Sequence, residues 1–177
     1  VCALLCPHAP PIDRISIRAD TAGALGFVRH QQHTHKYVVT QGRLLDDICV
    51  LMGGREAEQL LLNDLSIGSA GDLVRATGIA RALVEEFGAG GQQVGIGYFP
   101  TQNDPGQPRQ QLSASHLEAI DRQVGNILEQ QRERASELLS GNVQLLESLR
   151  DLLLEKQVID SKTLSQLANS QTPQSSR

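Results

Sequence analysis

The chain has 177 residues, which is enough for one hydrophobic core or two small ones, and aromatic residues make up only 3% of it, with no Trp. Its core must therefore be built from Leu, Ile, Val and Ala. The net charge of −4 and the isoelectric point near 5.7 provide no basic surface for phosphate backbones, so we expect no nucleic-acid partner.

Three cysteines, Cys2, Cys6 and Cys49, form an odd set without C-x-x-C spacing. Their apolar surroundings are typical of reduced thiols that act as small hydrophobic side chains in a cytosolic compartment. No apolar run approaches the roughly 18 residues that a membrane-spanning helix needs. The first six residues, VCALLC, have the pattern of the last turns of a helix, so we expect the chain to be part of a longer protein.

A β hairpin is predicted near the start of the chain. Alternation of period two begins at Ile12, and the segment from Leu25 to His30 can pair with this first strand. Three imidazoles, those of His30, His33 and His35, could converge on zinc or copper at this spacing. The alternative is a solvated strand end rich in His and Gln, which we favour because no Cys or carboxylate lies nearby in the sequence.

Two helical patterns then flank a loop of small residues. Thr40 is a suitable N-cap for the first pattern, whose apolar residues recur at helical spacing up to Leu62. Gly53 and Gly54 interrupt it, and each glycine costs about 1 kcal/mol relative to Ala in a helix. We interpret the pair either as the close approach of another backbone or as a kink. The second pattern covers residues 73–87.

Asp72 stands where the second helix begins. Ser69 and Asp72 fit the S-x-x-D pattern of a capping box, in which Asp72 reaches back to the Ser69 amide and also gains from the helix dipole. The competing interpretation is a metal ligand, and the local pattern by itself favours the cap. No H-E-x-x-H, P-loop or nucleophile elbow occurs in the 177 residues.

The best candidate for a domain boundary is a stretch rich in Pro, Gln and Asn. Beyond it, apolar residues keep three-and-four spacing from Leu117 to Leu138, a break falls at Gly141, and two further helices follow, the last capped by Asp160 or Ser161. We predict four parts: a core domain at 1–99, a flexible connection at 100–111, a C-terminal helical assembly element at 112–168 and a disordered tail at 169–177.

These motifs together resemble the C-terminal peptidase domain of FtsH-type ATP-dependent zinc metalloproteases. The family's LLGGRAAEE is similar to LMGGREAEQ at 51–59, and its TTGASNDLxRATxIARxMVxxFG is similar to residues 66–88. Matches at ALG (24–26), VGIGYF (94–99) and the C-terminal helices extend the resemblance over nearly the whole chain. It implies a mainly α metalloprotease domain with a small β hairpin or edge sheet, followed by a C-terminal helical element.

The resemblance also implies a zinc site. In that family two His from an H-E-x-x-H helix and one Asp bind the metal, and the Asp falls on Asp72. We expect the H-E-x-x-H motif immediately before Val1, so no catalytic residue lies within this chain and the fragment itself is inactive. An unfolded polypeptide would add as a strand beside the residues that resemble the family's edge strand, which are Leu25, Gly26, Phe27 and Val28.

Family relatives carry an upstream ATPase module that binds ATP, usually have a membrane anchor, and assemble as hexamers. The resemblance therefore implies an ATP-dependent zinc endopeptidase that degrades unfolded or membrane proteins at the cytoplasmic face of a membrane, with this fragment itself soluble. The alternative is a non-catalytic pseudoprotease scaffold of the same fold. It is motivated by Gly71, which replaces the family's usual Asn before Asp72, and by Glu56, which replaces an Ala.

Overall fold

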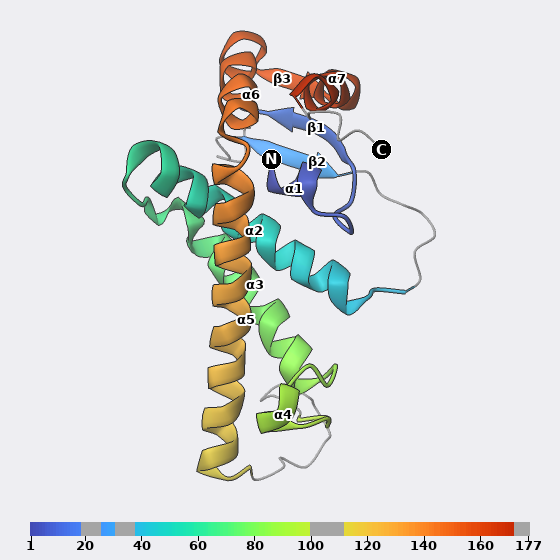
Figure 1. Cartoon of the computed structure of the whole chain (residues 1–177), viewed down its shortest axis with the longest axis vertical. Coiled ribbons are helices and arrows are strands. Elements are labelled where there is room, and N and C mark those ends of the chain that lie inside the picture. The colour runs from blue at the N-terminus through green and yellow to red at the C-terminus, as the bar shows by residue number, and fades with distance from the viewer. Residues whose placement is uncertain (19–25, 31–37, 100–111, 172–177) are drawn as a thin grey trace.

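The computed structural model describes residues 1–18, 26–30, 38–99 and 112–171. Three long helices pack against one another, and a small sheet with two further helices lies at one end of them (Figure 1). The long helices are α2 (Gln41–Leu62), α3 (Ala70–Glu85) and α5 (Ala114–Ser140). The sheet end contains β1 (Ile12–Ser16), β2 (Phe27–His30), β3 (Val158–Asp160), α6 (Val143–Lys156) and α7 (Ser161–Gln171). Short helical segments are α1 (Cys2–Leu5), η1 (Ile67–Ser69) and α4 (Gly91–Val94). The predicted mainly α class is confirmed.

The sheet is antiparallel with the strand order β2-β1-β3. Ile15 pairs with Val28 on one side and with Ile159 on the other, so the predicted hairpin is confirmed. The third strand, β3, was not predicted, because three residues are too few to show a period of two. A Cβ atom at Gly26 would lie 2.7 Å from the Ser16 carbonyl oxygen, so the close approach of the two strands requires glycine there.

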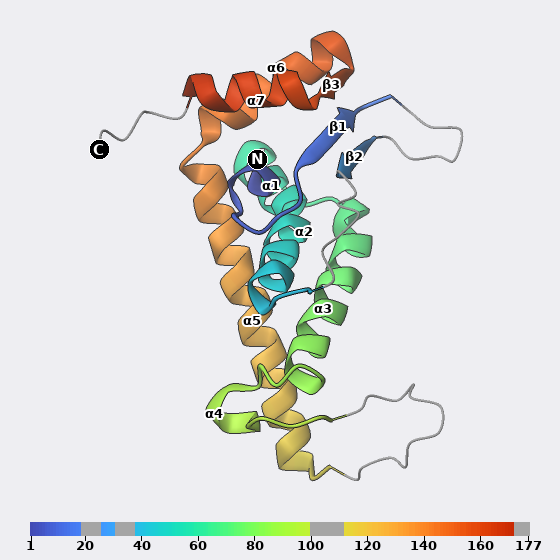
Figure 2. The ribbon, with the colours of Figure 1, turned by 90° about the vertical axis from the view of Figure 1, so that its right-hand side faces the viewer.

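The main core lies between the long helices. In Figure 2, α2 lies between α5 and α3, and buried residues from all three helices form one continuous cluster. Alanines on α3 and α5 let the backbones come close. The fully buried members include Ile48, Cys49, Ala76, Ala80, Leu83 and Ala135. Helix α5 thus shares its core with α2 and α3, and the division into 1–99 and 112–168 stays a prediction.

A second, smaller cluster joins the sheet to α6 and α7. Its buried members are Ile12 and Ile159 from the sheet, Leu145 and Leu149 from α6, and Leu164 from α7. Asp160 accepts a hydrogen bond from the Thr163 amide at 2.9 Å and so caps α7. Of the two predicted caps, Asp160 is therefore the one that contacts the first turn.

Helix α2 differs from its prediction at the paired glycines. It begins after Thr40, whose hydroxyl accepts a hydrogen bond from the Arg43 amide at 3.2 Å as predicted, and runs without interruption to Leu62. Of the two interpretations of the glycine pair, the kink between two helices is therefore wrong, because packing of the buried stripe outweighs the modest helix penalty of glycine. The close neighbour at Gly53 is the Cys2 side chain, whose Sγ lies 3.0 Å from the position of an added Cβ.

Helices α3 and α5 end close to the glycines predicted to end them, Gly88 and Gly141. Helix α3 ends at Glu85, and Gly88 beyond it has a φ of 71°, which glycine adopts readily. The predicted connection at 100–111 and residues 172–177 of the predicted tail lie outside the described residues.

Within the described ranges, none of the helices combines the length and apolar character required to cross a bilayer.

Candidate functional site

Asp72 lies in the first turn of α3, just after the segment that connects α2 to α3. Its side chain is 48% exposed and forms an ion pair with the Arg75 guanidinium, with Nη1 3.8 Å from Oδ1. An exposed ion pair at this distance contributes little to stability. The carboxylate is therefore available to a ligand.

The predicted capping box is wrong. The Ser69 side chain makes no capping hydrogen bond, because η1 runs directly into α3 and the Ser69 backbone is already helical, with φ −79° and ψ −2°. The capping role falls to Ser66, whose hydroxyl accepts a hydrogen bond from the Gly68 amide at 3.2 Å. The local cap that competed with a metal-ligand role for Asp72 is thus absent from the described structure.

Glu58 on α2 ties down the loop that leads to Asp72. One carboxylate oxygen accepts a hydrogen bond from the Ser66 amide and the other from the Ser66 hydroxyl, both at 2.9 Å. Ser66 in turn caps η1, so a chain of contacts runs from α2 to the start of α3. Glu58 is the functional neighbour that sequence reasoning missed. It lies within the LMGGREAEQ motif, eight residues before its partner, and no helical periodicity links the two positions.

We expect Glu58→Ala to loosen this loop while leaving the helices folded. The loss of two charge-assisted hydrogen bonds at a partly exposed site should lower the free energy of unfolding by about 1 kcal/mol. Amide hydrogen exchange should accelerate at Ser66 and Gly68. The neighbouring variant Gln59→Ala removes only a 3.3 Å side-chain contact with Asn63 and should leave both exchange rates unchanged. Equal acceleration in the two variants would contradict the role given to Glu58.

Apolar side chains surround this loop on the surface. Ile67 is 96% exposed, and the exposed residues near it in the chain are Leu62, Leu65, Leu73 and Val74. Exposed apolar residues grouped in this way on a folded domain mark contact surfaces for other polypeptides. Asp72 therefore lies in a segment that exposes several apolar side chains.

The residues predicted to bind substrate lie at the outer edge of the sheet. Among the described strands, β2 pairs only with β1, and Phe27 and Val28 are 45% and 49% exposed. Gly26 precedes β2, whereas Leu25 lies outside the described residues. Asp72 lies on a different element, in the first turn of α3.

The predicted histidine cluster is only partly described. His30 Nδ1 lies 3.0 Å from the Pro10 carbonyl oxygen, which requires that nitrogen to donate a hydrogen bond. His33 and His35 lie outside the described residues. Throughout 1–18, 26–30, 38–99 and 112–171, no three His, Cys, Asp or Glu residues are arranged to hold a metal ion.

A buried carboxylate organises the segment that follows α1. Asp46 on α2 is only 2% exposed, and its Oδ2 accepts a hydrogen bond from the His8 amide at 2.7 Å while its Oδ1 pairs with Arg134 Nη1 at 2.7 Å. Burial opposes ionisation of Asp46, but these hydrogen bonds outweigh it and lower the pKa of the carboxyl below its usual value. Arg43 also donates a hydrogen bond to the His8 carbonyl oxygen at 3.2 Å. The segment after α1 is thus fixed to α2 and α5.

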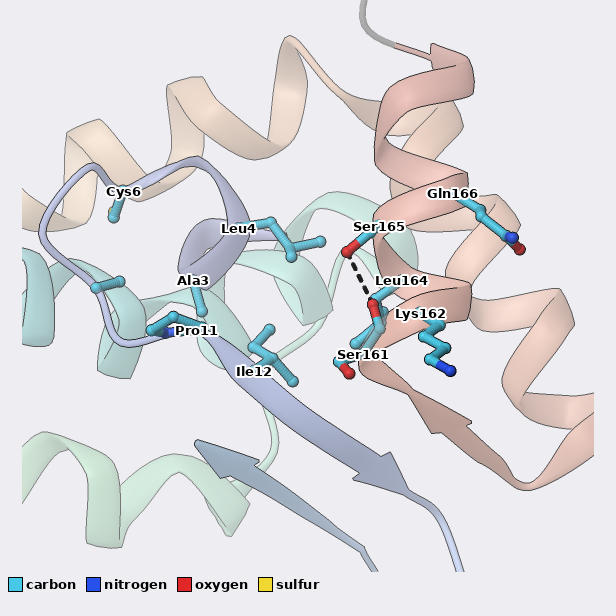
Figure 3. Close-up of a pocket in the computed structure, with 11 residues that line it drawn as sticks. Ala3, Leu4, Cys6, Pro11, Ile12, Ser161, Lys162, Leu164, Ser165 and Gln166 are labelled. Carbon is cyan, nitrogen blue, oxygen red and sulfur yellow. Dashed lines mark hydrogen bonds between the residues drawn. The ribbon is translucent and has the colours of Figure 1, made fainter. Parts of the chain in front are cut away.

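A cavity of about 690 Å³ opens between this segment and α7. Figure 3 shows Leu4 and Ile12 pointing toward α7, while Lys162 and Gln166 point away from them. The cavity contains neither Asp72 nor the residues of β2. Its polar lining comes from Ser161, Lys162, Ser165 and Gln166 of α7, and the Ser165 hydroxyl already donates a hydrogen bond to the Ser161 carbonyl oxygen at 2.8 Å.

Comparisons with a family model and with known proteins agree on one protein family. The model of peptidase family M41 matches residues 1–167. The chain is 34% identical over 173 residues to the ATP-dependent zinc metalloprotease FtsH of Ralstonia pickettii, covering 92% of this chain and 24% of that protein. It is 32% identical over 176 residues to the ATP-dependent zinc metalloprotease FtsH 1 of Thermoanaerobacter sp., covering 96% of this chain and 28% of that protein. The chain thus spans about a quarter of the length of these relatives.

The fold and these matches define an FtsH-type peptidase domain, which is the class of protein that the sequence motifs predicted. The chain belongs to peptidase family M41.

Proposed function

We propose that this chain is the peptidase domain of an ATP-dependent zinc endopeptidase, in which Asp72 is the carboxylate ligand of the zinc ion. The observation that carries the proposal is the state of Asp72: its side chain is half exposed, makes no cap, and is paired only loosely with Arg75. Carboxylate oxygen is a ligand that zinc accepts in catalytic sites. The names of the relatives support zinc and ATP as the cofactors.

The described residues supply Asp72 as a single donor and hold no three-residue metal group, so they do not fit a complete zinc site. We propose that two imidazoles of an H-E-x-x-H motif outside this chain complete it, and that the 177 residues alone do not hydrolyse peptide bonds. When bound in such a site, zinc polarises a scissile carbonyl and activates water. The role of this chain is to hold Asp72 in place through Ser66 and Glu58.

The substrate in this proposal is an extended polypeptide. Its backbone would pair with the outer edge of β2, where Phe27 and Val28 are half exposed and Gly26 lets the strand lie close to β1. Hydrogen bonds to a strand edge involve main-chain groups, so they suit substrates of many sequences. Unfolded or membrane proteins fit this requirement. We further propose an ATPase module, a membrane anchor and hexameric assembly in the full-length protein, in line with the resemblance.

Removal of metal tests the proposal. In the full-length protein that contains this chain, treatment with 1,10-phenanthroline should abolish hydrolysis of casein, and stoichiometric zinc should restore it, because the attacking water depends on the metal. Magnesium, which prefers octahedral oxygen sites, should not restore it. Casein hydrolysis that persists without zinc would contradict the proposal.

A non-catalytic scaffold of the same fold is the second candidate. The observation that favours it is Arg75, because a cation 3.8 Å from the Asp72 carboxylate competes with a metal ion for that group. The same experiment separates the two candidates. A scaffold would bind no zinc and would not cleave casein under any metal condition.

A further inference from the structure

A carboxylate, not an apolar side chain, ends the buried face of α2. Glu56 is only 4% exposed and is the last buried residue of this helix, whereas residues 59–62 beyond it are exposed. The last buried apolar residue is Met52, one turn earlier, and after it α2 adds only the partly buried Ala57 to the core. The end of α2 that carries Glu58 is therefore held to the rest of the domain largely through the contacts of Glu56.

Arg132 reaches Glu56 from α5, which packs along α2 (Figure 2). Its Nη1 donates a hydrogen bond to Glu56 Oε2 at 3.2 Å, and the Arg55 guanidinium contacts Oε1. Glu129 orients the same Arg132 guanidinium, with its Oε1 2.6 Å from Nη2. Both oxygens of the buried carboxylate thus have a cationic partner, which a buried charge requires. The result is a hydrogen-bonded link between α5 and the end of α2.

From Glu56 the contacts continue to the start of α3. Side chains two positions apart on a helix point to roughly opposite faces, so Glu56 can face α5 while Glu58 faces the loop before α3. Glu58 accepts hydrogen bonds from the Ser66 amide and hydroxyl, and the Ser66 hydroxyl accepts one from the Gly68 amide. Helix η1 then runs directly into α3, whose first turn carries Asp72.

We propose that Glu56 and Arg132 are positioning residues for the Asp72 carboxylate. They fix the end of α2 against α5, so that Glu58 keeps the loop before α3 in place. The inference rests on the proposed function in naming zinc as the ion that Asp72 binds, whereas the hold on the loop does not depend on zinc. Glu56, which replaces an Ala of the family motif, thus has a partner on α5 and a role in the site.

Amide hydrogen exchange in the full-length protein that contains this chain tests the hold on the loop. Glu56→Ala should accelerate exchange of the Ser66 and Gly68 amides about tenfold, which is the effect of losing one charge-assisted hydrogen bond. Glu56→Gln keeps an oxygen for Arg132 and should stay within about twofold of the wild type. Glu129→Ala removes a different carboxylate from the same guanidinium, leaves its contact with Glu56, and should change neither rate.

Zinc affinity, measured in the same protein by competition with a chelating indicator, shows whether the loss of order reaches Asp72. Glu56→Ala should weaken zinc binding about tenfold, the lower end of what loss of an indirect support costs a metal site. Ile159→Val is the control for stability, because it shortens a side chain in the buried cluster that joins the sheet to α6 and α7. It should lower the melting temperature and leave both the zinc affinity and the two exchange rates unchanged.

Unchanged exchange in Glu56→Ala would overturn the inference. Equal acceleration in Ile159→Val would do the same, because the ion pair would then act only on overall stability. Accelerated exchange with wild-type zinc affinity would reject the role toward Asp72. If the wild-type protein binds no zinc, the proposed function fails, and the exchange rates still decide whether Glu56 holds the loop.

A second variant covers the case in which Glu56→Ala does not fold, as judged by circular dichroism. Arg132→Ala then decides by the same criteria, because it breaks the link to α5 but leaves Glu56 its contact with Arg55.

Discussion

Asp72→Ala in the full-length protein is expected to reduce zinc-dependent hydrolysis of casein on the order of 100-fold or more, because loss of a metal ligand costs at least as much as loss of a group that only orients one. The same change should leave folding nearly untouched. Asp72 is half exposed and its ion pair with Arg75 is long, so the free energy of unfolding should change by less than about 0.5 kcal/mol. Casein assays, zinc analysis and thermal unfolding of the same preparation measure these effects together.

Glu147→Ala is a closely matched control for this experiment. Glu147 on α6 is also 48% exposed, and it pairs with Arg150 three residues later at 3.9 Å. The control therefore removes an equivalent surface carboxylate and ion pair from a different helix. Activity and zinc content should stay at the wild-type level. Equal loss of activity in both variants would mean that Asp72 acts only through general surface electrostatics.

The largest expected effect on stability is at Asp46. Asp46→Ala should lower the free energy of unfolding by about 3 kcal/mol or more, because it leaves the Arg134 guanidinium without its partner and the His8 amide without its acceptor. Chemical denaturation measured by circular dichroism provides the value. The adjacent Asp47, which is 30% exposed and whose ion pair within the described ranges is with Arg43, is the control, and Asp47→Ala should cost less than about 1 kcal/mol.

Acidification should reproduce part of this effect. The folded-state pKa of Asp46 is lowered, so its contribution to stability is fully present above the unfolded pKa of about 3.9 and is lost as the pH falls through the folded value. Wild-type stability should therefore fall more steeply below pH 4 than the stability of Asp46→Asn. Parallel curves for the two proteins would show that Asp46 does not titrate differently in the folded and unfolded states.

Local sequence patterns predicted the helices and the hairpin well, because these elements are long or have clear caps and breaks. Thr40, Asp160 and Gly88 each mark an end that the structure also has. The patterns failed where tertiary contacts decide the outcome. The paired glycines lie inside a continuous α2 because packing outweighs their low propensity, and β3 exists only because β1 offers it a partner.

At the candidate site, too, local sequence patterns could not predict contacts between separate elements. Asp72 fits two local roles by sequence, and the structure rejects the capping role because η1 shifts the cap from Ser69 to Ser66. The contacts that support this region, such as those of Glu58 with Ser66, join positions on different elements, and no local pattern specifies them. Asp46 and Arg134 likewise meet across 88 positions of sequence. The metal-ligand role of Asp72 remains a prediction that rests on the family motif.

The most direct test of this role is a crystal structure of the full-length protein grown with zinc, with anomalous diffraction measured on both sides of the zinc absorption edge. We expect one zinc ion bound by an Asp72 carboxylate oxygen at about 2.0 to 2.2 Å together with two imidazoles. A zinc ion bound elsewhere with Asp72 still paired to Arg75, or no anomalous peak near the start of α3, would contradict the account.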